Sequence, residues 1–439
     1  MTQVYARGRR LLRVSPTPAH GLIAETVALS EVPDVLALIS PENPLLWWRR
    51  GAGMVGFGTA VSLEFSGRGR IAEASSAWSD LVASSTVNDA VNIPGTGLLA
   101  WGTFAFRSSS AFVSRLIVPR YVVGSRDGVG WFTRHRSASD PADALTPASA
   151  KALLSELTSH AQVASEAGRT AVTFSSGQLS ESDFSSAVSQ AVARIESGEV
   201  EKVVLARDIT GTFAGSHNLA PSLRHLVESY PDCWTFAVDG LFGSSPETLV
   251  SVHDHRVSAR VLAGTARRGS DSASDLANAA ALASSPKDLD EHGFATRSVI
   301  DSLEPFTTEL TASDDPFTLK LPNLWHLATD ISAKLTGGST SLDLVSALHP
   351  TAAVAGTPMA VAVEVIDELE PFDRGRYAGP VGWIGADGDG EWAIALRCAQ
   401  VVGDRVTAYA GGGIVAESIP EMELAETQMK FRPIVDALS

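Results

Sequence analysis

The chain has 439 residues, of which 44% are hydrophobic and 19% charged, a balance typical of a globular protein with a large core. A formal net charge of −16, with no lysine- or arginine-rich run, argues against nucleic-acid binding. Two cysteines and no hydrophobic run near the ~18 residues of a membrane span argue against a disulfide framework and a membrane protein. We expect a soluble cytoplasmic protein in which Cys233 and Cys398 are free.

Short hydrophobic bursts in residues 1–135 indicate antiparallel strands joined by turns. Residues 72–89 are predicted to form a helix lying on such a sheet. Trp47 and Trp48 are interpreted as core residues rather than as a platform for a ligand. Nothing in this region predicts catalysis.

A polar segment, residues 136–182, is predicted to hold a short helix and a connecting loop. It is the best candidate for a boundary within the chain. Apolar positions at helical spacing then predict a helix over 183–199, which Ser180 and Asp183 are placed to cap.

Lys202 is the second residue of the next segment, residues 201–207, which is predicted to be a strand. Lys202 shares one face of that strand with Val204 and Ala206. A lysine on a buried face is desolvated and loses proton affinity, so it becomes a usable base. The alternative is a lysine at the end of the strand that reaches water, and the pattern leaves both readings open.

Glu247 follows a turn and precedes a predicted strand, a placement suited to a fixed acid, although glutamate after Ser-Pro is also common in loops. Residues 260–267 are predicted to end a strand in a turn at Gly264-Thr265, whose backbone N–H groups suit a carboxylate. Residues 275–303 are predicted to be helical, with a start signal at Ser285.

Residues 305–318 are predicted to form an acidic, threonine-rich connection, and 323–329 a strand that carries His326. A core histidine with satisfied hydrogen bonds is the simpler interpretation of His326. Arg397 lies among apolar residues in a predicted strand. A buried arginine needs an anionic partner, which can be internal or a bound carboxylate.

A glycine run, residues 411–413, leads into Ser418 and Glu421, which stand at the S-x-x-E spacing of a capping box and predict a helix start. Three side chains then share one face of that helix: Glu423, Glu426 and Lys430. Two carboxylates beside a glycine backbone suggest a site where a hard cation meets an anionic ligand. A solvated acidic face with an internal Glu–Lys pair is the alternative.

Eight segments occur in an order that resembles the chorismate-utilising enzymes, and among them the isochorismate synthases. They are Lys202-Val-Val-Leu-Ala-Arg, Ser245-Pro-Glu247, Leu262-Ala-Gly-Thr-Ala, Lys287-Asp-x-x-Glu291-His, His326-Leu-x-Thr, Leu348-His-Pro-Thr, Arg376-Tyr-Ala-Gly-Pro-Val-Gly-Trp and the glycine-rich segment that leads into the acidic C-terminal helix. These motifs cover about residues 180–433, and the first half of the chain carries no matching signature.

The resemblance implies an α+β fold, a large single domain of two packed antiparallel β-sheets with helices on the outside. Residues 1–180 would be an N-terminal β-rich half that contributes to the shared sandwich, and 181–435 the chorismate-binding catalytic region. It also implies Mg²⁺ as the cofactor, chorismate as the substrate, and a product that feeds menaquinone or siderophore biosynthesis. We expect a monomer with no nucleic-acid or membrane partner.

The family's functional residues match particular positions here. Lys202 matches the base that activates water for attack at C2 of the ring, and Glu247 the acid that protonates the departing C4 hydroxyl. Both are needed because hydroxide is a poor leaving group. The acidic cluster around Mg²⁺ matches Glu291, Glu423 and Glu426. The substrate-binding positions match Gly264, Thr265, His326, Ala353, Tyr377, Arg397, Gly412, Gly413 and Lys430.

Two alanines bear on the branch of the family. Ala353 resembles the isochorismate synthase form of the His-Pro-Thr loop, and Ala263 stands where aminating members carry a lysine. Ala352 departs from the proline usual in the family. A salicylate synthase, which also eliminates pyruvate, is the nearest alternative. An aminating enzyme and a non-catalytic homologue are the more distant ones.

Overall fold

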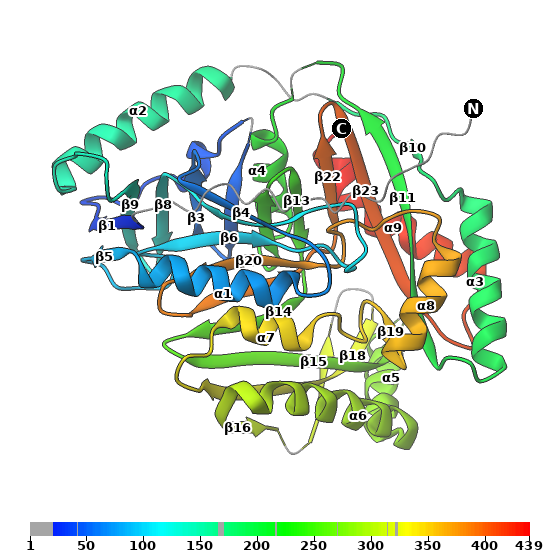
Figure 1. Ribbon diagram of the computed structural model, residues 1–439. Helices are drawn as coiled ribbons and strands as arrows, with labels where there is room; N and C mark the ends of the chain where they lie inside the picture. The colour runs from blue at the N-terminus through cyan, green and yellow to red at the C-terminus, as the bar shows by residue number, and fades with distance from the viewer. Residues whose placement is uncertain are drawn as a thin grey trace, which may run out of the picture.

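Two large β-sheets dominate the computed structural model, with helices around them (Figure 1). The structure describes residues 21–439 except 42, 166–170, 216, 270, 314 and 321–323, and the side chains of 160–165, 265, 287, 291 and 324 also lie outside the described part. The predicted α+β architecture of two packed sheets with outer helices is confirmed.

Sheet A has 13 strands, and all its pairs are antiparallel except β1 with β5. Its strands, in spatial order, are β10 (Ser175–Ser176), β11 (Lys202–Thr212), β23 (Arg405–Ile414), β22 (Cys398–Val402), β13 (Leu241–Ser245), β12 (Trp234–Val238), β2 (Leu45–Arg49), β3 (Ala52–Phe57), β8 (Tyr121–Arg126), β9 (Val129–Ser137), β1 (Leu22–Ala28) and β5 (Thr86–Asp89), with β19 (Gly356–Thr357) paired to β11.

Sheet B has 10 strands, all paired antiparallel. Its strands, in spatial order, are β16 (Thr307–Ala312), β18 (Leu324–Leu335), β15 (Arg256–Arg267), β14 (Thr248–His253), β21 (Gly390–Ile394), β20 (Pro380–Gly385), β6 (Leu99–Thr103), β7 (Ser114–Val118) and β4 (Val61–Phe65), with β17 (Phe317–Lys320) paired to β18. In both sheets, strands from the two halves of the chain are neighbours: β2 pairs with β12, and β6 with β20.

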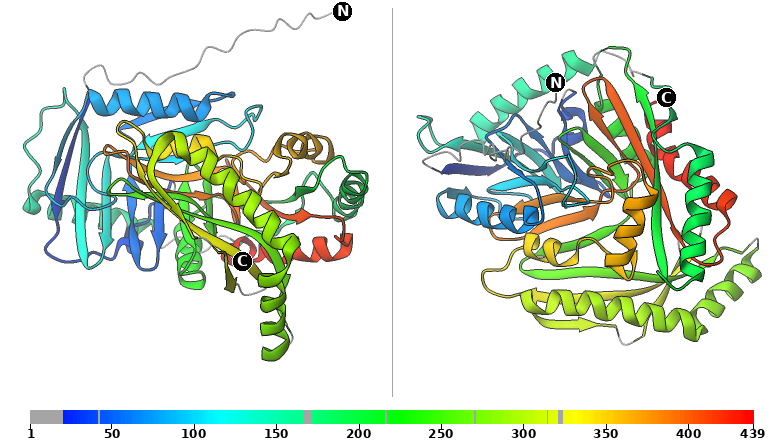
Figure 2. Two further views of the ribbon diagram at one scale, coloured as in Figure 1. Left: turned by 90° about the horizontal axis from the view of Figure 1, so that it is seen from below. Right: turned by 45° about the vertical axis from the view of Figure 1, so that its right-hand side comes forward.

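The helices lie on the outer faces of these sheets (Figures 1 and 2). They are α1 (Arg70–Ala83), α2 (Pro147–Ser165), α3 (Glu181–Glu196), α4 (Ala220–Ser229), α5 (Ser272–Ser284), α6 (Pro286–Leu303), α7 (Ser341–Leu348), α8 (Met359–Leu369) and α9 (Pro420–Ala437), with short 3₁₀ turns η1 (Val35–Leu38) and η2 (Glu304–Phe306). None of the described helices is long and apolar enough to cross a membrane.

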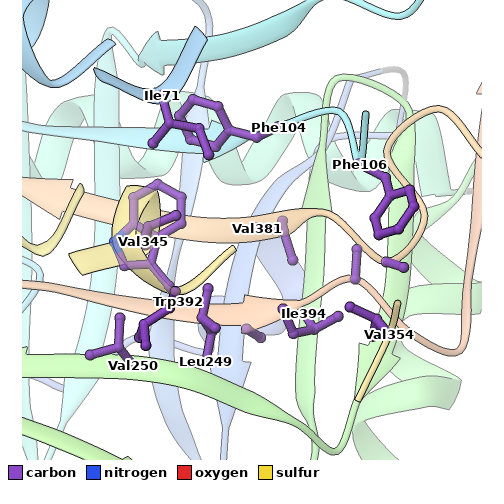
Figure 3. Packing of buried hydrophobic residues seen from close by; sticks show 14 of the residues in the cluster. Ile71, Phe104, Phe106, Leu249, Val250, Val345, Val354, Val381, Trp392 and Ile394 are labelled. Atoms are coloured by element: carbon purple, nitrogen blue, oxygen red, sulfur yellow. The ribbon is translucent and has the colours of Figure 1, made fainter. Parts of the chain in front are cut away.

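The hydrophobic core follows from the alternation of side chains along each strand. In β2, Trp47 faces the largest cluster, which lies between the sheets and continues to α1 and α7, while Leu46 and Trp48 face a second cluster under α4 and α9. Figure 3 shows part of the larger cluster, where Val345 of α7 packs near Trp392 and Val250 of sheet B. Both tryptophans of β2 are core residues, as predicted, with 1% and 9% of their surface exposed.

Several predicted elements were wrong in extent. The helix expected over 72–89 ends at Ala83, because Thr86–Asp89 form the edge strand β5. The connection expected over 305–318 contains strand β16, whose exposed positions hid its threonine-rich strand pattern. Residues 275–303 form two helices, α5 and α6, which meet at Ser285; Ser285 caps the second helix through the N–H of Asp288.

Candidate active site

Glu247 lies in the short turn between β13 and β14, where the chain passes from sheet A to sheet B. Its backbone is held at both ends, because its N–H donates to Ser245 Oγ (3.2 Å) and its carbonyl accepts from the N–H of Ile394 (3.1 Å). No described residue donates a hydrogen bond to its carboxyl group.

Two effects act in opposite directions on the pKa of the Glu247 carboxyl. Burial raises the pKa of its carboxyl, and three nearby positive charges only partly offset that rise. These charges belong to Lys202, Lys430 and Arg397. The predicted base and acid therefore lie within electrostatic reach of each other, and Glu247 keeps its proton to a higher pH than an ordinary glutamate does.

Lys202 is the first residue of β11 and pairs with Thr357 of β19. Its half-buried side chain passes over Gly413, where an added Cβ would lie 3.0 Å from Lys202 Cε and 3.8 Å from Nζ. The amine has no hydrogen bond or ion pair with a described residue. The sequence left open whether Lys202 is desolvated on a buried strand face or lies at the end of the strand. The structure has features of both: Lys202 starts the strand, and its half-buried side chain lies along the glycine backbone within electrostatic reach of Glu247.

The acidic face of α9 lies against the neighbouring glycine. A Cβ on Gly412 would lie 3.2 Å from Glu423 Oε2, 3.7 Å from Glu426 Oε1 and 3.8 Å from Lys430 Nζ. Lys430 Nζ donates to the carbonyl of Gly411 (2.7 Å) and pairs with Glu426 Oε1 (2.5 Å). The alternative of an internal Glu–Lys pair is thus partly correct, but the pair is half-buried at the candidate site.

Ser418 does not form the predicted capping box. Helix α9 begins at Pro420 with Ile419 as its N-cap, and no side chain caps it. Ser418 Oγ instead donates to Glu423 Oε1 (2.8 Å). Burial raises the pKa of Glu423, the bond from Ser418 opposes this rise, and the charge of Glu426 adds to it.

His326 lies on β18 beside a bulge at Gly264. Strand β15 runs without interruption from Arg256 to Arg267, so the turn predicted there is wrong: Gly264, with a φ of +75°, provides a β-bulge inside the strand. His326 Nδ1 lies 3.3 Å from the carbonyl oxygen of Gly264. Burial and the charges of Lys202 and Lys430 lower the pKa of His326, which therefore stays neutral at neutral pH.

Arg397 lies between β21 and β22 rather than within the predicted strand, with a φ of +47°. Its guanidinium makes no hydrogen bond or ion pair with a described residue, although Tyr377 and Glu426 are close enough to raise its pKa against the larger lowering by burial. Tyr377 is 4% exposed and stacks on Tyr409 at 5.3 Å, and burial raises the pKa of its hydroxyl. A half-buried cation without a bonded anion suits a ligand carboxylate.

Ala353 is exposed in the loop between α7 and α8. The turn is closed by the N–H groups of Val354 and Ala355, which both donate to the carbonyl of Thr351 (3.1 Å each). The carbonyl of Ala355 in turn accepts from the N–H of Val204 (2.9 Å), so this loop is bonded to the strand that begins at Lys202.

Two predicted positions cannot be placed in the site. The side chains of Thr265 and Glu291 lie outside the described residues, although Glu291 belongs to helix α6. Among the side chains that the structure describes, no group of three or more histidines, cysteines or carboxylates could hold a metal ion. The three-glutamate cluster therefore stays a prediction, with Glu423 and Glu426 brought together and Glu291 untested.

Sequence reasoning missed the buried ion pair behind Lys202. Glu370 and Arg374 are 4% and 0% exposed, and Arg374 donates two hydrogen bonds to Glu370 (2.8 and 2.5 Å). A Glu and an Arg four residues apart at the head of the Arg376 motif were the available signal. It was weak, because the same spacing is common on exposed helices.

Comparison with known proteins identifies this arrangement. Residues 19–439 match the family described as chorismate binding enzyme, so the chain belongs to that family. The isochorismate synthase DhbC of Bacillus subtilis is 41% identical over 268 residues, which cover 58% of this chain and 67% of that protein. The isochorismate synthase EntC of Escherichia coli K12 is 37% identical over 258 residues, 58% of this chain and 66% of that protein.

Two solved structures match this chain over nearly its whole length. A putative 2,3-dihydroxybenzoate-specific isochorismate synthase, DhbC from Bacillus anthracis, is 30% identical with a TM-score of 0.68, and the match covers 92% of this chain and 98% of that one. MenF, the menaquinone-specific isochorismate synthase from Escherichia coli, has a TM-score of 0.73 over 95% of both chains, but at 24% identity this likeness shows the fold alone.

Proposed function

We propose that the chain interconverts chorismate and isochorismate, with Lys202 as the base and Glu247 as the acid. It is an isochorismate synthase, as its relatives at 37–44% identity are named. One observation supports the assignment of roles: Lys202 lies within electrostatic reach of Glu247, burial raises the pKa of the Glu247 carboxyl, and neither side chain has a bonding partner among the described residues.

In this mechanism, the unprotonated amine of Lys202 removes a proton from water while the water oxygen bonds to C2 of the ring. The ring double bonds shift, the C4–oxygen bond breaks, and Glu247 donates its proton to the departing hydroxyl, which leaves as water. Burial keeps Glu247 protonated to higher pH, as a general acid requires. The two groups then return to their starting protonation states by exchange with solvent.

Glu423 and Glu426, together with Glu291, are proposed to hold Mg²⁺. The described residues fit a cation, because Glu423 Oε2 and Glu426 Oε1 both face Gly412 and the negative charge of Glu426 raises the pKa of Glu423. When bound, Mg²⁺ supplies positive charge for the ring carboxylate of chorismate and for the negative charge that develops on the ring. An acidic protein can bind a dianion in this way.

The substrate carboxylates are proposed to be held by residues around this site. Arg397 offers a guanidinium without a bonded anion, and the hydroxyl of Tyr377 has no hydrogen bond to a described residue. Gly412 and Gly413 allow a ligand to approach the backbone closely, and His326, Lys430, Gly264, Thr265 and Ala353 complete the proposed set. All of these positions fall within 181–435, which we assign as the catalytic region, and one monomer supplies them all.

Incubation with chorismate and Mg²⁺, followed by chromatography of the products, tests the reaction. Isochorismate is the expected main product. Salicylate or free pyruvate as the main product would indicate a salicylate synthase, and anthranilate formed with ammonium would indicate an aminating enzyme. A chelator is expected to stop turnover reversibly, and activity in excess chelator would contradict the metal assignment.

A further inference from the structure

The strand that carries Lys202 lacks a neighbouring strand along part of one edge. On one side, β11 pairs with β23 from Val203 to Thr212. On the other side, β19 pairs only with Lys202 and Val203, and β10 only with Ile209 and Thr210. Between them, the backbone groups of Val204 and Ala206 need other partners, because a buried N–H or C=O group without a hydrogen bond destabilises the fold.

Arg374 and Glu370 supply two of those partners, and the carbonyl of Ala355 supplies a third by accepting from the N–H of Val204. Arg374 donates to the carbonyl of Val204 (2.7 Å), and Glu370 Oε1 accepts from the N–H of Ala206 (2.8 Å). The two side chains are bonded to each other twice, so the pair forms a rigid unit that occupies the position of a missing strand.

The same unit reaches the loop of Ala353. Arg374 Nη1 donates to the carbonyl of Val354 (2.9 Å). The guanidinium carbon lies 4.6 Å from the ring centroid of Phe106 and 5.9 Å from that of Tyr377. Figure 3 shows Phe106 and Val354 at the same end of the hydrophobic cluster. One buried pair therefore contacts the strand of the proposed base, the Ala353 loop and a proposed substrate-binding residue.

Stability alone does not account for charged residues here. Burial would lower the pKa of Arg374, and Glu370 more than offsets that effect and raises it, so the guanidinium keeps its charge. Apolar side chains of similar volume are often as stabilising as a buried ion pair, or more so. They cannot, however, direct hydrogen bonds to three separate backbone groups. This ion pair therefore provides directed hydrogen bonds to the backbone rather than a net gain in the free energy of unfolding.

We propose that Glu370 and Arg374 are positioning residues that fix the Lys202 end of β11 and the Ala353 loop relative to each other for catalysis. The proposal rests on the proposed roles of Lys202 and Ala353. A misplacement of about 1 Å at a reacting group can cost ~100-fold in rate, so loss of this frame should lower kcat while the carboxylate-binding groups keep KM nearly unchanged.

The test compares two buried arginines in the same segment. Arg374→Lys is expected to lower kcat about 10- to 100-fold with KM changed less than about threefold. Arg376→Lys is the matched control, because Arg376 is 5% exposed and pairs with Asp239 and the carbonyl of Val113, away from β11. It is expected to lower the melting temperature comparably with kcat per folded molecule within about twofold. Equal kcat losses in the two variants would overturn the proposal.

Two further variants separate positioning from folding. The double variant Glu370→Leu/Arg374→Met removes both charges but also leaves three backbone groups without these partners, so we expect a lower melting temperature and, per folded molecule, the same loss of kcat as in Arg374→Lys. Glu370→Gln keeps an acceptor for the N–H of Ala206 but loses the charge and one of the two bonds to Arg374, so we expect a smaller loss of kcat than in the double variant, together with a lower melting temperature. Hydrogen exchange in residues 202–210 should accelerate in the double variant only. A folded double variant with normal kcat would refute the positioning role. Wild-type protein that left chorismate unchanged would instead refute the proposed function itself.

Discussion

Two glutamates, one in strand β21 and one in the turn before the neighbouring strand β14, show opposite ways of placing a carboxylate inside this protein. Glu391 lies in β21, and Glu247 immediately precedes β14, the strand that pairs with β21. Glu391 accepts hydrogen bonds from Trp47 (2.7 Å) and Trp383 (3.0 Å), and it pairs with Arg126 and His253. Burial alone would raise the pKa of Glu391, but these partners outweigh it and lower the pKa to about 2.

Glu247 has none of these donors, although cations surround it at longer range, and its pKa is raised. The difference teaches that burial alone does not decide the protonation of a carboxyl; the presence or absence of direct donors does. Glu391 stays ionised, and its hydrogen bond from Trp47 joins sheet A to sheet B. Glu247, without such donors, can hold and release a proton.

The largest effect is expected from Glu247→Gln. An amide cannot donate a proton to the leaving hydroxyl as an acid does, so kcat should fall about 10²- to 10⁴-fold. The melting temperature should stay close to that of the wild type, because the carboxyl of Glu247 has no direct partner to lose among the described residues. Turnover of chorismate and thermal unfolding measure the two quantities. Near-normal turnover would remove Glu247 from the mechanism.

The reverse result is expected from Glu391→Ala. Removing one partner of a buried charge cluster leaves Arg126 and the indole N–H groups without an acceptor, so the free energy of unfolding should fall by about 3–5 kcal/mol. The kcat of the folded fraction should change little. Urea unfolding gives the free energy, and an unchanged midpoint would show that the cluster around Glu391 adds no net stability.

Acid should weaken the fold through Glu391. Its pKa is about 2 in the folded protein against an ordinary value of 4.5, so the stabilisation is complete above pH 4.5 and is lost as the pH falls toward 2. The difference of about 2.5 units corresponds to on the order of 3 kcal/mol. Glu391→Gln should flatten the dependence of unfolding free energy on pH in that window. Glu247 acts in the opposite direction: because its pKa is raised in the folded protein, it lowers the free energy of unfolding at neutral pH, and this loss disappears as the pH falls and its carboxyl is protonated.

Glu423 is an intermediate case, because it has one donor, Ser418, and a raised pKa. Ser418→Ala removes a bond worth about 1 kcal/mol, so the apparent affinity for Mg²⁺ should weaken about fivefold with little change in stability. Titration of Mg²⁺ against initial rates and against the protein's intrinsic fluorescence checks this. Ser189→Ala is the control, because Ser189 is exposed on α3 and bonds only the carbonyl of Ser185 one turn earlier. An equal change in both variants would show that Ser418 has no particular role at Glu423.

The fold class and the family could be predicted because an ordered set of motifs specifies both, and the family is confirmed over residues 19–439. The reading of Ser180 as a cap was correct, because its Oγ accepts from the N–H of Asp183. The same reasoning failed at Ser418, since a serine before a helix can bond a side chain instead of the backbone, and the sequence does not distinguish the two.

The sequence identified the candidate reactive residues but not the strand pairing and the ion pair that hold them in position. The approach of Lys202 to Gly413, and of Glu423 and Glu426 to Gly412, depends on β11 lying beside β23, a pairing of strands far apart in the chain that no local pattern reveals. The edge of β11 filled by Glu370 and Arg374 was hidden for the same reason. The roles assigned to Lys202, Glu247 and the substrate-binding residues stay predictions until the variants are measured.

The turn that holds Glu247 has a mechanical consequence. Residues 246 and 247 alone connect β13 of one sheet to β14 of the other, while Lys202 belongs to the first sheet only. Sliding of one sheet over the other would therefore shift the proposed proton donor relative to the proposed acceptor. The larger hydrophobic cluster between the sheets, which contains Trp47 and Trp392, then sets the spacing of the two groups, and a truncation deep in that cluster is expected to lower kcat.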